Sequence, residues 1–439
     1  MDSDYRTGPA FAAEQDAADP LSAFRDRFSV PDELYLDGNS LGPVSDAAVA
    51  AVDRTMAAWR DLAIRGWTDA EPPWFWQGER LGDRLAPFVG AAPDEVVVAN
   101  QTTVNIHTLI GTFLDHPGVG PAAADAETAG ERPPGVLVND LDFPTDHYAI
   151  RAQLRARGYD PDDHLHLVES RDGRTVAAED VVAAMDAHDV GIVFMPSVLY
   201  RSGQLLDVER ITEAAAEREI LAGFDLAHSV GVVPHDLAAH GVDFATWCSY
   251  KYLSAGPGAV AGLYVNEAHH GLVPALTGWW GHEKASQFEM NLTYTPADSA
   301  GAWQIGTIHV LSAAPLAGSL EILEDAGIDR VREKSIDLTG YLAHLVDERL
   351  AEHGFAVGTP RDPDRRGGHV AVEHDAADRI SEALRDRGVI VDYRPPNVIR
   401  ICPHPLYTSY ADVRAAVDHL ADVVESGAYE AVDLDADVT

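Results

Sequence analysis

The sequence predicts an α/β fold, with a mostly parallel central sheet covered by helices and a smaller α+β domain at the C-terminal end. Short, continuously apolar runs rich in β-branched residues alternate with helical patterns along most of the chain. Strands that are buried on both faces are typical of parallel sheets lying between two layers of helices. The length of 439 residues exceeds what one hydrophobic core usually covers, which predicts a second domain.

Six apolar runs are predicted strands, and three amphipathic stretches are predicted helices of the larger domain. The strands are 95–99, 136–138, 191–195, 220–224, 244–248 and 260–265, and the helices are 48–62, 177–187 and 208–218. Residues 115–134 are rich in Ala, Gly, Pro and acidic residues, which can bury little apolar surface. We expect this stretch to be an exposed insertion.

The pattern changes after about residue 310, which predicts the second domain. Helices are expected at 316–325 and 336–353, and separate strands at 369–372 and 398–402. We therefore divide the chain into an N-terminal arm (1–45) that contributes to the small domain, a large ligand-binding domain (46–308) and a small C-terminal domain (309–439). The acidic tail after Gly427 is expected to fray.

Charge and composition exclude several classes of function. The 71 acidic residues outnumber 32 Lys and Arg, and the formal net charge of −39 disfavours nucleic acid as a partner. Such a surface is tolerable when salt shortens the Debye length to ~3 Å, which indicates a salt-adapted microbe. No run reaches the ~18 apolar residues of a membrane span, and the start lacks a signal-peptide pattern, so we expect a cytoplasmic protein without membrane contact. Two cysteines, Cys248 and Cys402, are too few for a disulfide framework or a cysteine-built zinc site, and no metal is expected.

Only three lysines occur, and one of them lies in a distinctive segment. Lys251 stands in Trp-Cys-Ser-Tyr-Lys-Tyr-Leu, just after the predicted strand 244–248, whereas Lys284 and Lys334 have no such setting. A lysine amine can lose its proton and form a Schiff base with a carbonyl, and a guanidinium cannot. The sequence therefore predicts that Lys251 is a catalytic nucleophile.

Three further polar residues are candidates for the same site. Asp225 ends the predicted strand 220–224, at the edge where open α/β sheets bind ligands, and could keep a cofactor's ring nitrogen protonated. It could instead be a helix N-cap. His228 follows within a turn and could reach this Asp or a phosphate. Tyr250 could act as a general acid or simply pack in a strand.

These motifs resemble the cofactor site of the kynureninase family, which are pyridoxal-phosphate enzymes with the aspartate aminotransferase fold. The main match is the segment 224–262, with Asp-Leu-Ala-His-Ser-Val-Gly and Trp-Cys-Ser-Tyr-Lys-Tyr-Leu. Tyr-Leu-Asp-Gly-Asn-Ser-Leu-Gly at 35–42, Phe-Pro-Thr-Asp-His-Tyr at 143–148, Gly-Trp-Trp-Gly-His-Glu at 278–283 and Pro-Leu-Tyr at 405–407 are also similar, in the family's order. The resemblance covers roughly residues 20–425, and it implies that the chain catalyses the reaction of this family.

That reaction would be hydrolysis of L-kynurenine to anthranilate and L-alanine in tryptophan catabolism and NAD biosynthesis, with the 3-hydroxy form left open as a second substrate. The resemblance implies that pyridoxal 5'-phosphate (PLP) binds in the large domain. Lys251 would bind PLP covalently and move the Cα proton, Asp225 would face the ring nitrogen, and Tyr250 would protonate Cβ. His228 would also contact the cofactor.

The resemblance assigns the remaining cofactor contacts to several segments. Thr102 and Thr103 open a helix after the strand 95–99, where free N–H groups and the helix dipole favour a phosphate. The helix start could also be simple capping. The other implied contacts are Phe143, Pro144, Thr145, Asp146, Trp279 and Thr307. Trp279 and Thr307 resemble positions that reach the phosphate from the partner subunit, so the resemblance implies a homodimer with a shared site.

Arg400 and Trp67 are the candidate substrate-binding residues. Arg400 is a lone charged residue in an apolar strand pattern. Burying its charge there costs free energy unless the guanidinium contacts an anion. It matches the arginine with which the family binds the substrate carboxylate, although a salt bridge with one of the many acidic residues is the alternative. Trp67 corresponds to an aromatic position near the substrate's aniline ring.

Three other functions share parts of this pattern. A cysteine desulfurase or selenocysteine lyase has the same fold and the same Asp, His and Lys arrangement, but needs a nucleophilic cysteine on a mobile loop. Cys402 is the candidate, although its surroundings are typical of a strand. A class V aminotransferase and a non-catalytic PLP-binding protein would also share the cofactor-binding motifs.

Overall fold

The computed structural model describes residues 5–116, 119 and 135–434 of the chain, and its larger part is built on a seven-stranded sheet. The strand order is β2-β8-β7-β6-β5-β3-β4. The strands are β2 (Val96–Val98), β3 (Val136–Asn139), β4 (Leu165–Val168), β5 (Ile192–Pro196), β6 (Leu221–Asp225), β7 (Phe244–Trp247) and β8 (Gly262–Val265). All neighbours from β4 to β7 are parallel, and β8 is antiparallel to β2 and β7. The mostly parallel sheet predicted from the sequence is confirmed.

Two strands depart from the general pattern of parallel, continuously apolar runs. The connection from β7 to β8 contains no crossover helix, so β8 returns antiparallel. The strand β4 was not predicted from the sequence. It forms the edge of the sheet, and only its first and last residues, Leu165 and Val168, are buried, so it lacks a continuous apolar run.

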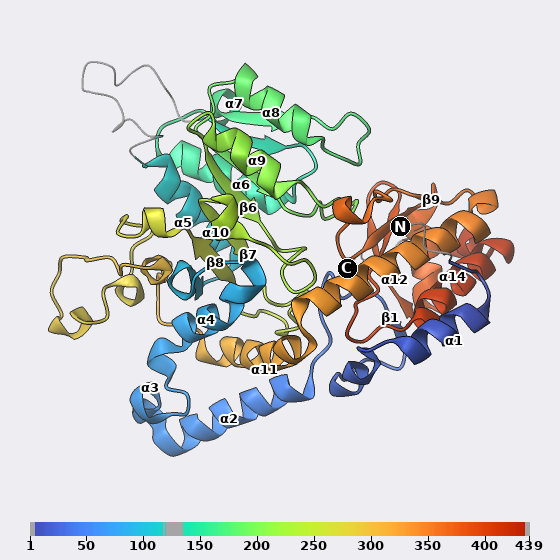
Figure 1. Cartoon of the computed structure of the whole chain (residues 1–439), viewed down its shortest axis with the longest axis horizontal. Helices are drawn as coiled ribbons and strands as arrows, with labels where there is room; N and C mark the ends of the chain where they lie inside the picture. The colour runs from blue at the N-terminus through green and yellow to red at the C-terminus, as the bar shows by residue number, and fades with distance from the viewer. Residues whose placement is uncertain (1–4, 117–118, 120–134, 435–439) are drawn as a thin grey trace.

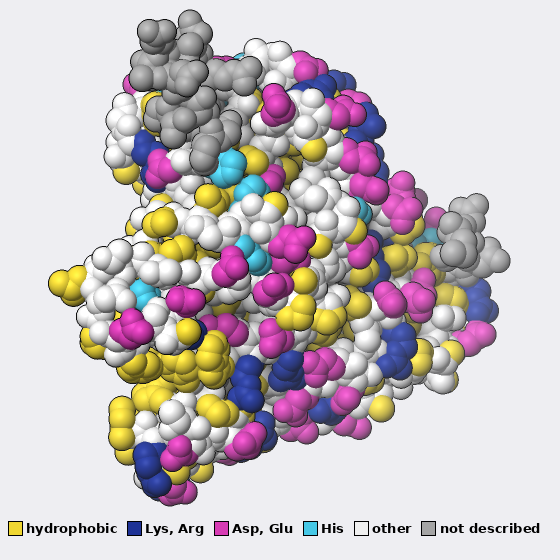
Figure 2. Space-filling view, turned by 60° about the vertical axis from the view of Figure 1, so that its left-hand side comes forward, with side chains coloured by type: hydrophobic (Ala, Val, Ile, Leu, Met, Phe, Trp, Pro, Cys, Tyr) yellow, Lys and Arg dark blue, Asp and Glu magenta, His cyan; other side chains and the backbone are white. Residues whose placement is uncertain are grey.

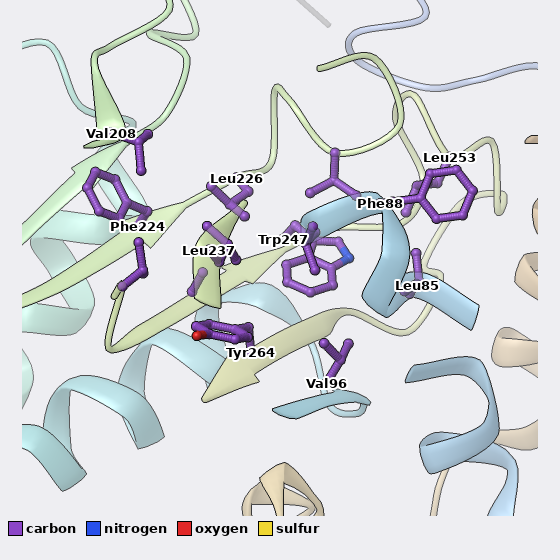
Figure 3. Packing of buried hydrophobic residues seen from close by; sticks show 14 of the residues in the cluster. Leu85, Phe88, Val96, Val208, Phe224, Leu226, Leu237, Trp247, Leu253 and Tyr264 are labelled. Carbon is purple, nitrogen blue, oxygen red and sulfur yellow. The ribbon is translucent and has the colours of Figure 1, made fainter. Parts of the chain in front are cut away.

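Helices cover both faces of this sheet (Figure 1). One face carries α4 (Gln77–Val89), α8 (Ala178–Ala187), α9 (Val208–Ala216) and α10 (Leu237–His240), and the other carries α5 (Thr102–Leu114) and α6 (Pro144–Ala156). Successive strand residues point to opposite faces, so Val96 packs with α4 and Val97 packs with α5. Figure 3 shows the first of these layers, where Phe88 of α4 and Trp247 of β7 belong to the same hydrophobic cluster.

The C-terminal domain has its own antiparallel sheet and its own core. Its strand order is β12-β13-β10-β9, with β9 (Ala356–Val357), β10 (Val370–Glu373), β12 (Asp392–Arg394) and β13 (Val398–Ile401). The helices α12 (Ile328–Arg349), α13 (Ala377–Arg385) and α14 (Tyr410–Glu425) contribute to this core. The predicted α+β character of the C-terminal domain is confirmed, and Figure 1 shows it in orange and red beside the larger sheet.

The N-terminal segment lies against the C-terminal domain. The helix α1 (Pro9–Ala18) packs on α14, and β1 (Leu34–Tyr35) pairs in parallel with β11 (Val389–Ile390). Two long helices, α2 (Asp46–Leu62) and α11 (Val310–Ala326), pack against each other beside α4. Short helices α3 (Gly66–Asp69) and α7 (Pro161–His164) complete the α-helices of the described residues, and short 3₁₀ turns lie between these elements.

The predictions for the C-terminal tail and for the insertion 115–134 can be compared with the structure only in part. The chain after Gly427 was expected to fray, yet Tyr429 and Val432 pack against the C-terminal core, because the short helical turn Ala428–Ala431 contacts both α13 and α14. Most of the predicted insertion 115–134 lies outside the described residues. None of the helices in the described ranges combines the length and the apolar character that a membrane crossing requires.

Candidate active site

A cavity of about 260 Å³ opens where the carboxyl ends of the parallel strands face the C-terminal domain. Its lining comes from both sheets and from the N-terminal segment. The lining residues are Asn39, Ser40, Thr102, Thr103, Phe143, Thr145, Tyr200, Asp225, Ala227, His228, Cys248, Tyr250, Lys251, Arg394 and Arg400. Nine of these were predicted from the sequence, so motifs far apart in the chain meet at one place.

Lys251 and His228 form the centre of the cavity. Lys251 follows β7 and His228 follows the neighbouring β6, and Lys251 Nζ lies 2.8 Å from His228 Nε2. Burial, and then the charge of Lys251, hold the pKa of His228 well below its usual range. The neutral ring can therefore accept a hydrogen bond from the Lys251 amine. The sequence suggested a contact of His228 with Asp225 or a phosphate, and among the described residues its hydrogen bond is with Lys251.

Asp225 is the last residue of β6 and is almost fully buried. Its Oδ1 accepts a hydrogen bond from the backbone N–H of Ala227 at 2.7 Å. Burial raises its pKa to about 6, although the positive charge of Lys251 opposes this shift. The residue starts a turn and caps none of the helices in the described ranges, which leaves the N-cap alternative without support.

Asp146 lies behind this centre, in the first turn of α6. Its carboxylate is fully buried, and neither oxygen has a hydrogen-bond partner within the described part of the chain. Burial, and then the charge of Asp225, raise the pKa of Asp146. A buried polar group without a partner is costly, so this carboxyl fits a site that receives a polar ligand.

Two helix N-termini converge on the cavity. The helix α5 begins at Thr102, and α6 begins at Pro144. The hydroxyls of Thr103 and Thr145 lie 2.9 Å apart, so the first turns of the two helices are adjacent. Free N–H groups and helix dipoles at such ends favour an anion such as a phosphate.

Aromatic side chains form another part of the wall. The Phe143 ring is 46% exposed and meets the Tyr200 ring edge to face, with 5.4 Å between the ring centroids. The Tyr250 ring lies beside Lys251, with its centroid 6.0 Å from Nζ. Burial raises the pKa of the Tyr250 hydroxyl, which keeps it protonated at neutral pH. A protonated phenol in this position can donate a proton.

Arg400 reaches the cavity from β13 of the C-terminal domain. It is 1% exposed and forms an ion pair with Asp392 on the neighbouring β12. The sequence offered two interpretations of Arg400, as an anion-binding residue or as part of an internal salt bridge. The residue lines the cavity and also has an internal acidic partner, so its place is compatible with both.

Besides Asp146, four predicted residues do not line this cavity within one chain. Trp67 and Thr307 line a separate apolar groove of about 600 Å³, together with Trp59. Trp279 is about half exposed, and its ring meets that of Trp280 with 5.7 Å between centroids. Pro144 begins α6 beside the cavity without lining it.

Sequence patterns did not reveal four polar or aromatic residues of the wall. These are Asn39, Ser40, Tyr200 and Arg394. Asn39 and Ser40 stand in the motif at 35–42, which carries the family resemblance without indicating a role for either residue. Arg394 lies two residues beyond Asp392 in a short strand, where a charged residue is indistinguishable from an exposed edge residue.

Neither cysteine is placed as an accessible nucleophile. Cys402 follows β13, is fully buried, and its Sγ lies 3.7 Å from the Tyr252 hydroxyl. Burial raises the pKa of Cys402 to about 12. Cys248 lines the cavity but is buried, and burial raises the pKa of its thiol too. Among the described residues, no cluster of His, Cys, Asp and Glu could hold a metal ion.

The other two lysines occupy settings unlike that of Lys251. Lys334 is buried in an ion pair with Asp19, with 2.7 Å between Nζ and Oδ2. Lys284 Nζ lies over the ring of Trp280, at 4.3 Å from the centroid. Neither of them lines the cavity, so Lys251 is its only lysine within the described chain.

Comparison with curated proteins gives extensive similarity to enzymes named kynureninase. The chain is 48% identical to the kynureninase of Geobacillus thermodenitrificans over 421 residues, which cover 96% of this chain and 95% of that protein. It is 43% identical to the kynureninase of Shouchella clausii, with coverages of 98% and 97%. The family model of the kynureninase C-terminal domain matches residues 331–420.

Comparison with solved structures supports the fold. A cysteine desulfurase from Thermococcus onnurineus aligns with a TM-score of 0.75 at 17% identity, covering 92% of this chain and 98% of that one. The cystine C–S lyase C-DES, in complex with cysteine persulfide, aligns with a TM-score of 0.74 at 16% identity, with coverages of 89% and 98%. At this low identity the likeness concerns the fold alone.

Proposed function

The chain belongs to the kynureninase family, and on this premise we propose that it hydrolyses L-kynurenine to anthranilate and L-alanine, with PLP as its cofactor. One observation carries the proposal at the level of the site. A single cavity joins a lysine amine, a buried aspartate and a buried arginine, supplied by Lys251, Asp225 and Arg400. These groups suit the cofactor aldehyde, its ring nitrogen and the substrate carboxylate in turn.

The residues present fit PLP. Buried polar atoms around the cavity lack partners among the described residues, including both carboxylate oxygens of Asp146 and Nδ1 of His228. Thr102 and Thr103 would hold the phosphate at the start of α5, and Phe143 would face the ring. When bound, PLP withdraws electrons from the substrate's Cα and so makes its proton removable.

The protein's own groups then have distinct tasks. The Lys251 amine takes the Cα proton, while His228 holds this amine in place through its hydrogen bond. Tyr250 is a phenol kept protonated by burial, and it delivers a proton to Cβ after the carbon–carbon bond breaks. Arg400 binds the carboxylate, and Asp225 keeps the ring nitrogen protonated.

The decisive experiment is incubation of the PLP-loaded protein with L-kynurenine. Anthranilate is followed by fluorescence and L-alanine by amino-acid analysis, and the assay is repeated in molar KCl because the acidic surface repels itself at low salt. Equal amounts of both products are expected. A fully loaded protein that forms neither product at any salt concentration would contradict the proposal.

The cysteine desulfurase alternative makes a separate prediction. Its chemistry needs a thiol that can reach the substrate, whereas Cys402 is fully buried behind Tyr252. We therefore expect no sulfide release from L-cysteine above the background of free PLP. Sulfide release that disappears in Cys402→Ala would favour the desulfurase function instead.

We also propose a homodimer with a shared site. Large apolar side chains are exposed along α2 and in the segment 273–292, among them Trp59, Trp279 and Phe288. Figure 2 shows a band of hydrophobic side chains at the lower left of this face. Contiguous apolar surface of this kind usually marks an interface. A second copy would cover it and bring Trp279 and Thr307 toward the other chain's cavity.

Subunit complementation tests the shared site. Lys251→Ala and Trp279→Ala proteins should each be impaired alone, and unfolding and refolding them together should restore part of the activity. Restoration is expected because one site of a mixed dimer combines Lys251 from one chain with Trp279 from the other. A monomeric mass in light scattering, or no restoration, would contradict the shared site.

We keep the division into an arm (1–45), a large PLP-binding domain (46–308) and a small domain (309–439) as a proposal. The pairing of β1 with β11 supports the arm's association with the small domain. The helix α11, at the start of the third unit, packs on α2 and so links the two larger units. The cytoplasmic location, the salt-adapted origin and the role in NAD biosynthesis stay predictions.

A further inference from the structure

The arginine assigned to the substrate carboxylate has few free donors. A guanidinium carries five N–H bonds. In Arg400, Nε donates to Asp392 Oδ1 at 2.7 Å, and one terminal nitrogen donates both to Asp392 Oδ2 and to Ser40 Oγ. The other terminal nitrogen donates to the Tyr200 carbonyl at 2.8 Å. One N–H bond of Arg400 therefore remains for a ligand.

Tight recognition of a carboxylate normally uses two parallel N–H bonds. Arg400 could provide the second only by giving up a hydrogen bond that it already makes to Ser40, to the Tyr200 carbonyl or to Asp392. Each of these acceptors would then lose its partner, and for the buried carboxylate of Asp392 this loss is strongly unfavourable. The geometry therefore calls for another donor beside Arg400.

Arg394 lies in the required place. It lines the same cavity, and its side chain is 32% exposed compared with 2% for Arg400. The described part of the chain gives it one hydrogen bond, from a terminal nitrogen to Asp392 Oδ2 at 2.8 Å, and its Nε has no partner. Several of its N–H bonds are thus available.

Strand pairing fixes the two arginines on the same side of the small sheet. Asp392 lies directly opposite Arg400 in the antiparallel pair of β12 and β13. Arg394 is two residues from Asp392 in β12, so the two side chains point to the same face. The shared acceptor Asp392 Oδ2 holds both guanidinium groups beside the cavity.

We propose that Arg394 is a second carboxylate-binding residue, which contacts the substrate's α-carboxylate together with Arg400, while Asp392 positions both. The inference rests on the proposed function for the identity of the substrate. Its physical content is independent of the reaction, because it concerns any amino acid held by its carboxylate in this cavity.

The first test compares ligands with and without the carboxylate. In the PLP-loaded Arg394→Gln protein, we expect KM for L-kynurenine to rise about tenfold, with kcat within about twofold, as for a lost hydrogen bond to a charged group. Kynuramine, which lacks the carboxylate, should inhibit the variant and the wild type equally. An unchanged KM, or an equal loss of kynuramine binding, would overturn the proposal.

A second test separates direct contact from an effect through Arg400. Arg394→Gln is combined with Arg400→Gln, and a further several-fold rise in KM over the single Arg400 variant is expected. If the second substitution adds nothing, Arg394 acts only by holding Arg400, and the proposal fails. Where turnover is too slow to measure, the dissociation constant of L-alanine, measured by calorimetry, replaces KM.

Two controls complete the design. Arg201→Gln removes a nearby arginine that does not line the cavity, and its KM should match that of the wild type. Arg394→Lys keeps the charge and should recover part of the affinity, which also excludes misfolding as the cause. If the wild type does not turn over kynurenine, the proposed function fails, and binding of L-alanine against ethylamine still tests Arg394.

Discussion

The two walls of the cavity satisfy their buried polar groups in different ways. On the wall from the large sheet, the Asp146 carboxylate and Nδ1 of His228 have no hydrogen-bond partner within the described chain. Asp225 accepts one hydrogen bond, from the backbone of Ala227. On the wall from the small sheet, Arg400 and Asp392 bond to each other and to their neighbours. The first wall therefore has unpaired polar groups that suit a large polar ligand. In the second wall the charged groups are already fixed by hydrogen bonds, which suits a small anionic group.

This contrast has consequences for stability and for specificity. Unpartnered buried groups cost free energy in the free protein, so the first wall should gain most when the cofactor binds. The second wall resists rearrangement, because breaking its ion pair would isolate a buried charge. Loss of a group from either wall should therefore appear in different measurements.

The largest effect is expected from the centre of the first wall. Lys251→Ala should lower kcat by about 10⁴-fold, because it removes the amine that we propose moves the Cα proton. Lys251→Arg should be equally inactive, since a guanidinium keeps the charge but does not give up its proton at neutral pH. Turnover of kynurenine is the measurement, with circular dichroism as the check on folding. An Arg variant with substantial activity would show that only the charge is needed.

The sequence could predict the first wall more completely than the second. Lys251, Asp225 and Thr102 each stand next to a short apolar strand, and parallel strands bring their carboxyl ends to one edge. The strand β4 was not predicted because an edge strand that is buried only at its two end residues lacks the continuous apolar signal.

The second wall depends on pairing that the sequence does not display. Arg400 was found as a lone charge in an apolar run, but its partner Asp392 follows from the register of β12 against β13. Arg394 stayed hidden because it stands in a polar stretch where a charge is unremarkable. Trp67 lines a separate apolar groove and not the cavity, and the sequence pattern does not show which of these two places an aromatic residue occupies.

An intermediate effect is expected from one substitution made on each wall in the cofactor-free protein. Asp392→Asn should lower the free energy of unfolding by about 3 kcal/mol, because Arg400 loses the charge of its buried partner. Burial alone would raise the pKa of Asp392, yet its bonds with Arg400 more than offset this and lower it. The ionised form therefore stabilises the fold at neutral pH.

Asp225→Asn is the matched change on the first wall. Burial raises the pKa of Asp225 to about 6, so the ionised carboxylate that predominates at pH 7.5 destabilises the fold relative to the unfolded chain. This substitution should leave the free energy of unfolding unchanged or raise it, although it removes activity. Urea unfolding at pH 7.5 measures both variants. Equal destabilisation by the two substitutions would remove the distinction between the walls.

The last effect on stability is expected at Asp37, a buried residue of the N-terminal segment close to Asp392 of the second wall. Burial, and then the charge of Asp392, raise the pKa of Asp37 to about 6 from the 3.8 of an ordinary aspartate. The folded protein keeps this proton up to about pH 6, whereas the unfolded chain releases it near pH 4. Stability contributed by the protonated form is thus present at low pH and is lost as the pH rises between these values.

Asp37→Asn should therefore raise the free energy of unfolding above pH 7, by at most the ~3 kcal/mol that corresponds to this pKa difference, and change it little near pH 4. Asp32→Asn is the control, because Asp32 is an exposed aspartate of the same segment and should show no such pH dependence. Urea unfolding of both variants between pH 4 and pH 8 measures the difference. A stabilisation that is the same at all pH values would mean that Asp37 does not titrate in this range. It would also mean that the negative charges of Asp37 and Asp392 do not repel each other measurably in the folded protein.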